Sequence, residues 1–109
     1  RVLFRSLAAI IAPDARRMTK FETMLEGLPI VIPARKEAIG ERGVLLLDIR
    51  LAKGLEFDQV IVPDVQQRIY PDETLARHRL YTAISRATRK VTLIANGKLT
   101  SLLSKCTVR

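Results

Sequence analysis

A short polar segment in the middle of the sequence holds residue types that can bind a charged ligand. It contains Lys53, Gly54, Glu56 and Asp58 within six positions of a 109-residue chain. The lysine offers a positive charge, the carboxylates accept hydrogen bonds, and the glycine allows backbone turns that other residues rarely adopt. This combination favours a ligand site, although the same residues would also suit a solvated connection without function.

Apolar runs on both sides of this segment predict the strands that position it. Residues 43–49 read Gly-Val-Leu-Leu-Leu-Asp-Ile, and residues 59–64 read Gln-Val-Ile-Val-Pro-Asp. Continuous apolar runs of this length, bounded by turn residues, are typical of strands buried on both faces of a parallel sheet. Because chemistry in open α/β sheets gathers where strands end, we expect the site at the carboxyl edge of the sheet.

The rest of the chain alternates between the two kinds of pattern. Short apolar runs bounded by proline, glycine or polar residues indicate strands, and apolar residues at helical spacing indicate helices. Strands are expected over residues 7–12, 28–33, 43–49, 59–64 and 90–95, and helices between Asp14 and Gly27, over 75–87 and over 99–103. We read residues 34–43 as a loop and predict an α/β fold with a mostly parallel sheet.

Length and composition predict one domain with a single modest core. No apolar run approaches the ~20 residues that a membrane span needs, and no signal peptide is visible, so we expect a cytoplasmic protein with no membrane partner. Cys106 is the single cysteine, which excludes an intramolecular disulfide and a cysteine-based zinc site. The net charge of +8 favours nucleic acid, nucleotide phosphates or an acidic protein as partner, or else reflects a solubility bias.

Two stretches resemble motifs of the UvrD/Rep-type superfamily 1 helicases. Residues 52–58, Ala-Lys-Gly-Leu-Glu-Phe-Asp, resemble their motif V, and residues 77–87, Arg-His-Arg-Leu-Tyr-Thr-Ala-Ile-Ser-Arg-Ala, resemble their motif VI. The order and spacing of the motifs also fit. The resemblance covers residues 7–103 and implies the C-terminal RecA-like motor domain, a three-layer α/β fold that is incomplete here. Within the family, the chain is most similar to the helicase IV or HelD-like branch.

The resemblance implies a role for each matching residue. Arg86 takes the position of the arginine finger, whose permanent charge stabilises the γ-phosphate during phosphoryl transfer. Glu56 matches the position that contacts the nucleotide ribose, Lys53 a charge that senses phosphate, and Gly54 an unusual turn or a close backbone approach. Arg77 matches the first arginine of motif VI, either as a second phosphate contact or as a partner for Glu56.

The same comparison implies that this chain holds only half of an active site. It contains no Gly-x-x-x-x-Gly-Lys-Ser/Thr phosphate loop and no partner acidic motif for magnesium. We therefore expect ATP with Mg to be held mainly by an N-terminal RecA-like domain of the same protein. We also expect no metal site in this chain and no ATP turnover by it alone.

The nucleic-acid side departs from the family pattern. The threonine and histidine that precede Ala-Lys-Gly in the family fall on Asp48 and Arg50 here. Arg50 can still hold a phosphate, but Asp48 would repel one. Two functions therefore stay open: an ATP-dependent helicase or translocase acting on single-stranded or duplex DNA, and a HelD-like ATPase that remodels or recycles RNA polymerase.

The first six residues, Arg-Val-Leu-Phe-Arg-Ser, fit nothing downstream. Read back through common codons, they correspond to the tail of a widely used sequencing adaptor. We expect residues 1–6 to be a non-native leader and residues 7–109 to form the motor domain.

Overall fold

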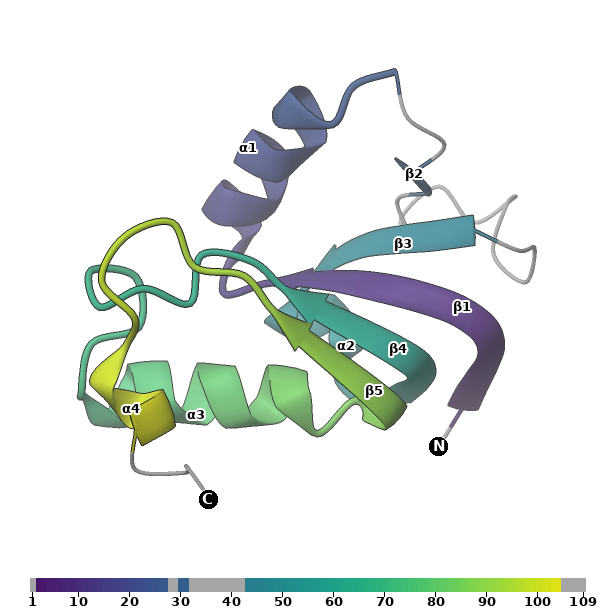
Figure 1. Ribbon diagram of the computed structural model, residues 1–109. Helices are drawn as coiled ribbons and strands as arrows, with labels where there is room; N and C mark the ends of the chain where they lie inside the picture. The colour runs from purple at the N-terminus through teal and green to yellow at the C-terminus, as the bar shows by residue number, and fades with distance from the viewer. Residues whose placement is uncertain (1, 28–29, 32–42, 105–109) are drawn as a thin grey trace.

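The computed structural model describes residues 2–27, 30–31 and 43–104, whose strands form one sheet (Figure 1). The sheet order is β2-β3-β1-β4-β5, and every neighbouring pair runs parallel. The strands span Val2–Ala12 (β1), Ile30–Val31 (β2), Gly43–Asp48 (β3), Leu55–Val62 (β4) and Ala87–Leu93 (β5). The predicted α/β class with a parallel sheet is confirmed.

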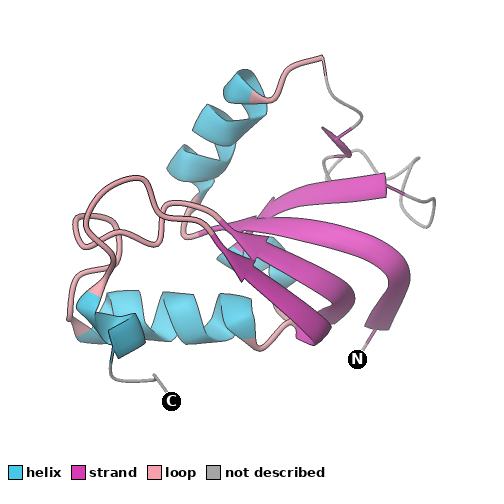
Figure 2. Ribbon diagram, viewed as in Figure 1, coloured by secondary structure: helices cyan, strands magenta, loops and turns pink. Residues whose placement is uncertain are grey.

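Helices lie on both faces of this sheet, which gives three layers (Figure 2). Alternate strand residues point to opposite faces, so Leu46 packs with α1 while Leu45 and Leu47 join the larger core with α3. The fully buried Phe57 belongs to that larger core. The helices span Ala15–Met24 (α1), Ile49–Ala52 (α2), Thr74–Ile84 (α3) and Ser101–Ser104 (α4).

The layer that contains α1 covers only part of the sheet. On β4, Val60 and Val62 face the larger core, so Gln59 points to the opposite face, where it is exposed. Lys90 and Thr92 of the neighbouring β5 are exposed as well. This face of β4 and β5 therefore lacks a covering helix within the described part of the chain, as expected of an incomplete three-layer domain.

Several element boundaries differ from the predicted ones. Strand β4 begins at Leu55 rather than near Gln59, so the carboxylates of Glu56 and Asp58 lie in a strand and not in a turn. Buried Phe57 anchors this extension to the core, a packing effect that the local polarity conceals. Helix α3 ends at Ile84, three residues earlier than predicted, because the following residues enter β5.

Strand β1 begins at Val2, before the predicted start at residue 7. Its pairing with β4 shifts register between Phe4 and Ala8, which is the region where the leader is expected to end. The origin of residues 1–6 stays a prediction. The predicted loop over 34–43, apart from Gly43 in β3, and Cys106 lie outside the described residues, as does most of the predicted strand over 28–33.

The polar stretch after β4 is more buried than its sequence indicates. Val65, Gln66 and Tyr70 are all buried in it. The Gln66 side chain accepts a hydrogen bond from the backbone amide of Asn96 at 2.8 Å, which compensates its burial. This loop is therefore a fixed part of the domain.

Across the described residues, none of the helices has the length and apolar character to cross a membrane.

Candidate nucleotide-binding edge

The segment between β3 and β4 crosses from the carboxyl ends of the strands, called here the carboxyl edge of the sheet, to their amino ends, the amino edge. Asp48 ends β3 at the carboxyl edge, and Lys53 and Gly54 precede Leu55, the first residue of β4. Since β3 and β4 both run parallel to β1, the end of one and the start of the other lie at opposite edges. The expectation of a site at the carboxyl edge is therefore wrong for Lys53 and Gly54, which lie at the amino edge.

Gly54 turns the chain into β4. Its φ is +85°, in the region that disfavours side chains, and a Cβ added there would meet nothing within 4 Å. Of the two roles left open for this glycine, the structure supports the unusual turn and gives no close backbone approach among the described residues. Lys53, directly before it, is exposed.

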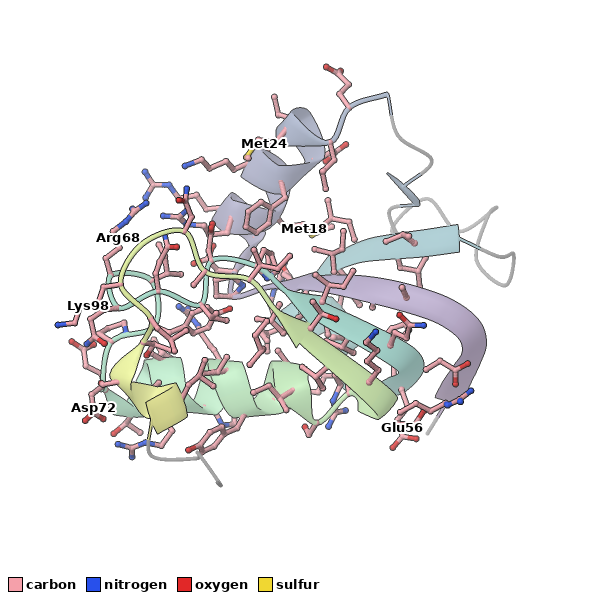
Figure 3. The ribbon with its side chains drawn as sticks, in the orientation of Figure 1. Met18, Met24, Glu56, Arg68, Asp72 and Lys98 are labelled. Carbon is pink, nitrogen blue, oxygen red and sulfur yellow. The ribbon has the colours of Figure 1, made fainter. Side chains whose placement is uncertain are left out.

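Glu56 is the second residue of β4 and is partly exposed. Figure 3 shows it at the amino end of the strand, across the molecule from Asp72. Its neighbour Phe57 is buried in the core and fixes this end of the strand. The carboxylate thus sits on a rigid element at the same edge as Gly54, which suits a group that must meet a ligand in one position.

Arg86 lies between the end of α3 and the start of β5, at the same edge as Gly54 and Glu56. Its carbonyl accepts from the Phe57 amide at 2.8 Å, which fixes its backbone against β4. Its guanidinium donates to the carbonyl of Thr82 at 3.2 Å, to the Ser85 hydroxyl at 3.2 Å and to the carbonyl of Leu55 at 3.5 Å. These bonds are long and use three of the five N–H donors of an arginine, so a ligand can still be contacted.

Arg77 does not join this group. It lies in the first turn of α3, and its guanidinium donates to the Asp72 carboxylate at 3.0 Å. Nine residues of rise separate it from Arg86, about 13 Å along a helix. The structure therefore brings together Lys53, Gly54, Glu56 and Arg86, and it places Arg77 at the other end of the helix.

Asp48 and Arg50 occupy the carboxyl edge instead. The Asp48 side chain is only 1% exposed and caps α2 by accepting from the Leu51 amide at 2.9 Å. Its other oxygen accepts from the Arg50 guanidinium at 3.2 Å, although the Arg50 side chain is 78% exposed. Asp48 thus caps α2 and also forms an ion pair with Arg50, the arginine that was expected to contact nucleic acid.

Part of the chain is similar to a known protein family. Residues 43–94, from the start of β3 to the residue after β5, match the model of the UvrD-like helicase C-terminal domain. A crystal structure of the C-terminal domain of a possible DNA helicase from Lactobacillus plantarum WCFS1 is similar, with a TM-score of 0.79 and 34% sequence identity.

That similarity covers 92% of this chain and 62% of the Lactobacillus chain, so the present chain spans less than two thirds of its neighbour's length. No curated protein sequence matches the chain. Both similarities are to C-terminal domains of helicases.

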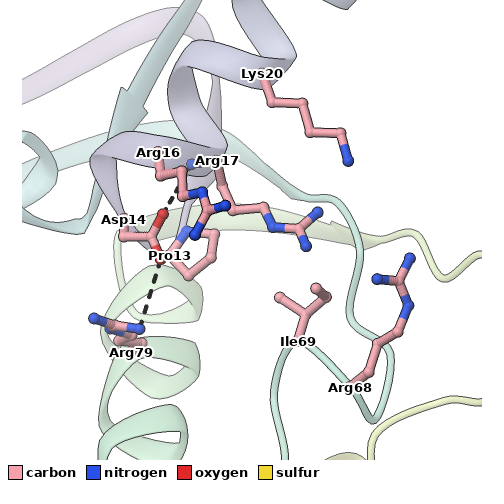
Figure 4. Close-up of a pocket in the computed structure, with 8 residues that line it drawn as sticks. All are labelled: Pro13, Asp14, Arg16, Arg17, Lys20, Arg68, Ile69 and Arg79. Atoms are coloured by element: carbon pink, nitrogen blue, oxygen red, sulfur yellow. Dashed lines mark hydrogen bonds and ion pairs between the residues drawn. The ribbon is translucent and has the colours of Figure 1, made fainter.

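The chain also carries a basic pocket that the sequence did not reveal (Figure 4). The pocket lies at the carboxyl edge, away from Arg86, and α1, α3 and the loop after β4 form its walls. Its cations come from positions far apart in the sequence, so only the packed structure shows that they share one site. The signal available beforehand was the net charge of +8, which gave no location.

Proposed function

We propose that this domain completes the ATP site of an ATP-dependent superfamily 1 DNA helicase or translocase. The observation that carries the proposal is the meeting of Arg86 with the start of β4, where its guanidinium contacts Leu55 beside Glu56. Lys53 and Gly54 directly precede this point. Two cations and a carboxylate at one edge suit a nucleoside triphosphate, because phosphates need positive charge and a ribose offers hydroxyl donors.

Arg86 is the group that acts on the reaction in this proposal. Phosphoryl transfer spreads negative charge over the γ-phosphate oxygens, and a guanidinium placed beside them stabilises that charge. The long hydrogen bonds to Thr82 and Leu55 orient the arginine while leaving it able to exchange partners. Glu56 accepts a hydrogen bond from a ribose hydroxyl, and Lys53 pairs with phosphate. Arg77 is left out, because Asp72 holds it at the far end of α3.

The remaining half of the site would belong to an N-terminal RecA-like domain of the same cytoplasmic protein, which would hold ATP with Mg. Among the residues described by the structure, no group of three or more His, Cys, Asp and Glu side chains could hold a metal ion. Closure of the cleft between the two domains would bring Arg86 to the nucleotide, and reopening after hydrolysis would move the strand. We expect the 109-residue chain alone to show no ATP turnover.

Strand displacement by the complete protein tests the helicase function. A labelled strand annealed to a longer one should be released with ATP and Mg but not with a non-hydrolysable analogue. Arg86→Ala should abolish the release, while Arg89→Ala, on exposed β5, should not. Release that is independent of nucleotide, or that survives Arg86→Ala, would contradict the proposal.

A HelD-like ATPase that remodels or recycles RNA polymerase is the second candidate. The observation that favours it is the pairing of Arg50 with Asp48, at the positions where related helicases have the threonine and histidine near the strand. ATP hydrolysis without strand displacement, stimulated by added RNA polymerase, would support this function over unwinding.

A further inference from the structure

The pairing of β5 with β4 is irregular near the start of β5. Strand β5 lies at the end of the described sheet, beside β4 (Figure 1). Phe57 pairs with Ala87, and the next pair joins Gln59 to Lys90. The chain thus advances by two residues on β4 and by three on β5, which leaves one extra residue at positions 88–89 of β5. Bulges are rare between parallel strands, and those beside functional sites change the direction of nearby side chains.

Phe57 holds the start of β5 through both of its backbone groups. Its amide donates to the carbonyl of Arg86 at 2.8 Å, and its carbonyl accepts from the hydroxyl of Thr88 at 3.2 Å. Phe57 itself is 0% exposed and belongs to the larger core. The residue before Ala87 and the residue after it are therefore both joined to one rigid position of β4.

A different register would misplace Arg86. If β5 slid by one residue to absorb the bulge, Arg86 would move by ~3.3 Å along the strand direction. The slip would break the backbone bond from Phe57 and the contact of the guanidinium with the Leu55 carbonyl at 3.5 Å. It would also exchange the faces to which the side chains of β5 point. The Thr88 hydroxyl opposes this slip, because the slip would carry it away from the Phe57 carbonyl.

We infer that Thr88 is a positioning residue for Arg86. It acts through the backbone of β4 and β5 and contacts no nucleotide itself. The inference rests on the proposed function, in which Arg86 must meet the γ-phosphate in one orientation. A misplacement of about 1 Å can cost about 10²-fold in rate, so molecules in a slipped register would contribute almost nothing to turnover. Thr88 follows directly after the stretch that resembles motif VI, so the motif did not point to it.

Single-turnover ATP hydrolysis by the complete protein tests this role. Thr88→Val keeps the shape of the side chain and its suitability for a strand but removes the hydroxyl. Hydrolysis should slow by about three- to tenfold, the factor that one hydrogen bond contributes to an equilibrium, while ATP affinity stays the same. Thr88→Ser keeps the hydroxyl and should restore most of the rate.

Thr92→Val is the matched control. Thr92 lies on the same strand, is exposed like Thr88, and makes no side-chain hydrogen bond among the described residues. The same chemical change at this position should leave hydrolysis at the wild-type rate.

The Arg86→Ala background separates positioning from a general effect on the fold. Because Thr88 acts only through Arg86, Thr88→Val should cause no further slowing once Arg86 has been removed. A residue that only stabilised the fold would slow hydrolysis by the same factor in both backgrounds.

Hydrogen exchange of the 109-residue chain tests the register without ATP. The Phe57 amide is protected by its bond to the Arg86 carbonyl, so its exchange rate reports whether β5 stays in register. Thr88→Val should raise this rate severalfold in NMR exchange measurements, and Thr92→Val should not.

Three results would overturn the inference: hydrolysis by Thr88→Val at the Thr92→Val rate, additional slowing by Thr88→Val in the Arg86→Ala background, or an unchanged exchange rate at Phe57. Equal slowing by Thr88→Val and Thr88→Ser would also contradict it. The proposed function fails separately. Wild-type hydrolysis by Arg86→Ala, together with faster Phe57 exchange in Thr88→Val, would leave a positioned arginine that does not act on ATP.

Discussion

A backbone hydrogen bond to β4 fixes the position of Arg86 without any ligand. Its carbonyl accepts from Phe57, and its guanidinium rests on Thr82 and Leu55 through bonds of 3.2 and 3.5 Å. Such weak contacts hold a preferred orientation, and breaking them would cost little if the guanidinium bound another acceptor. The Ser85 hydroxyl also accepts a hydrogen bond from this guanidinium and helps to orient it.

Gly54 is expected to matter through its backbone alone. Gly54→Ala should lower the free energy of unfolding by about 1–2 kcal/mol, because alanine is disfavoured at positive φ while its Cβ meets no atom. Gly54→Asn should cost less, since asparagine tolerates this conformation. Urea denaturation of both variants measures the difference, and equal stability of wild type and Gly54→Ala would refute the assigned role.

At the scale of single residues, the sequence pointed to Lys53, Gly54, Glu56 and Arg86 because the two motifs specify residue types at fixed spacing. The structure places these four residues at the same end of the sheet, and their roles stay predictions. It could not place Arg77, since a position in a motif does not show which end of a helix faces the ligand. The basic pocket was equally out of reach from sequence, because its cations meet only when α1 and α3 pack on one sheet.

Among the elements, α2 is short and depends on its cap. A four-residue helix has few internal hydrogen bonds, so the Asp48 carboxylate that accepts from Leu51 carries much of its order. The sequence predicted two strands around a polar segment, and it missed this helix because four residues give no detectable periodicity. It also missed the start of β4, where buried Phe57 overrides the polar residues beside it.

The cap and the ion pair of Asp48 can be separated by substitution. Asp48→Ala should lower the free energy of unfolding by about 1–2 kcal/mol, the usual cost of losing an N-cap, while Asp48→Asn should retain most of it. Arg50→Gln should change stability little, because the Arg50 side chain is 78% exposed. Thermal or urea unfolding checks all three, and a larger loss for Arg50→Gln than for Asp48→Ala would contradict the capping role.

At the scale of the whole molecule, α3 runs between the two ends of the sheet at which charged side chains gather. Arg79 lines the basic pocket at the carboxyl edge, and Arg86 follows the end of the helix at the amino edge. Seven residues of helix correspond to about 10 Å, so movement of α3 at one edge would be transmitted to the other.

The alternation of apolar runs with helical patterns predicted the fold class well, because strands that are apolar throughout occur mainly in parallel sheets buried on both faces. The opposite locations of Lys53 and Arg50 were not predictable in the same way. They follow from one short segment that crosses from the end of β3 to the start of β4. Lys53 and Arg50 are only three positions apart, so the sequence gives no sign that they lie at opposite ends of the strands.

The central claim is that Arg86 completes an ATP site held mostly by another domain. Single-turnover ATP hydrolysis by the complete protein tests it most directly, with nucleotide affinity measured in parallel. Arg86→Ala should slow hydrolysis by about 10³-fold or more while ATP still binds, and Arg89→Ala on neighbouring β5 should hydrolyse at the wild-type rate. Hydrolysis by Arg86→Ala at the rate of the Arg89→Ala control would contradict the claim.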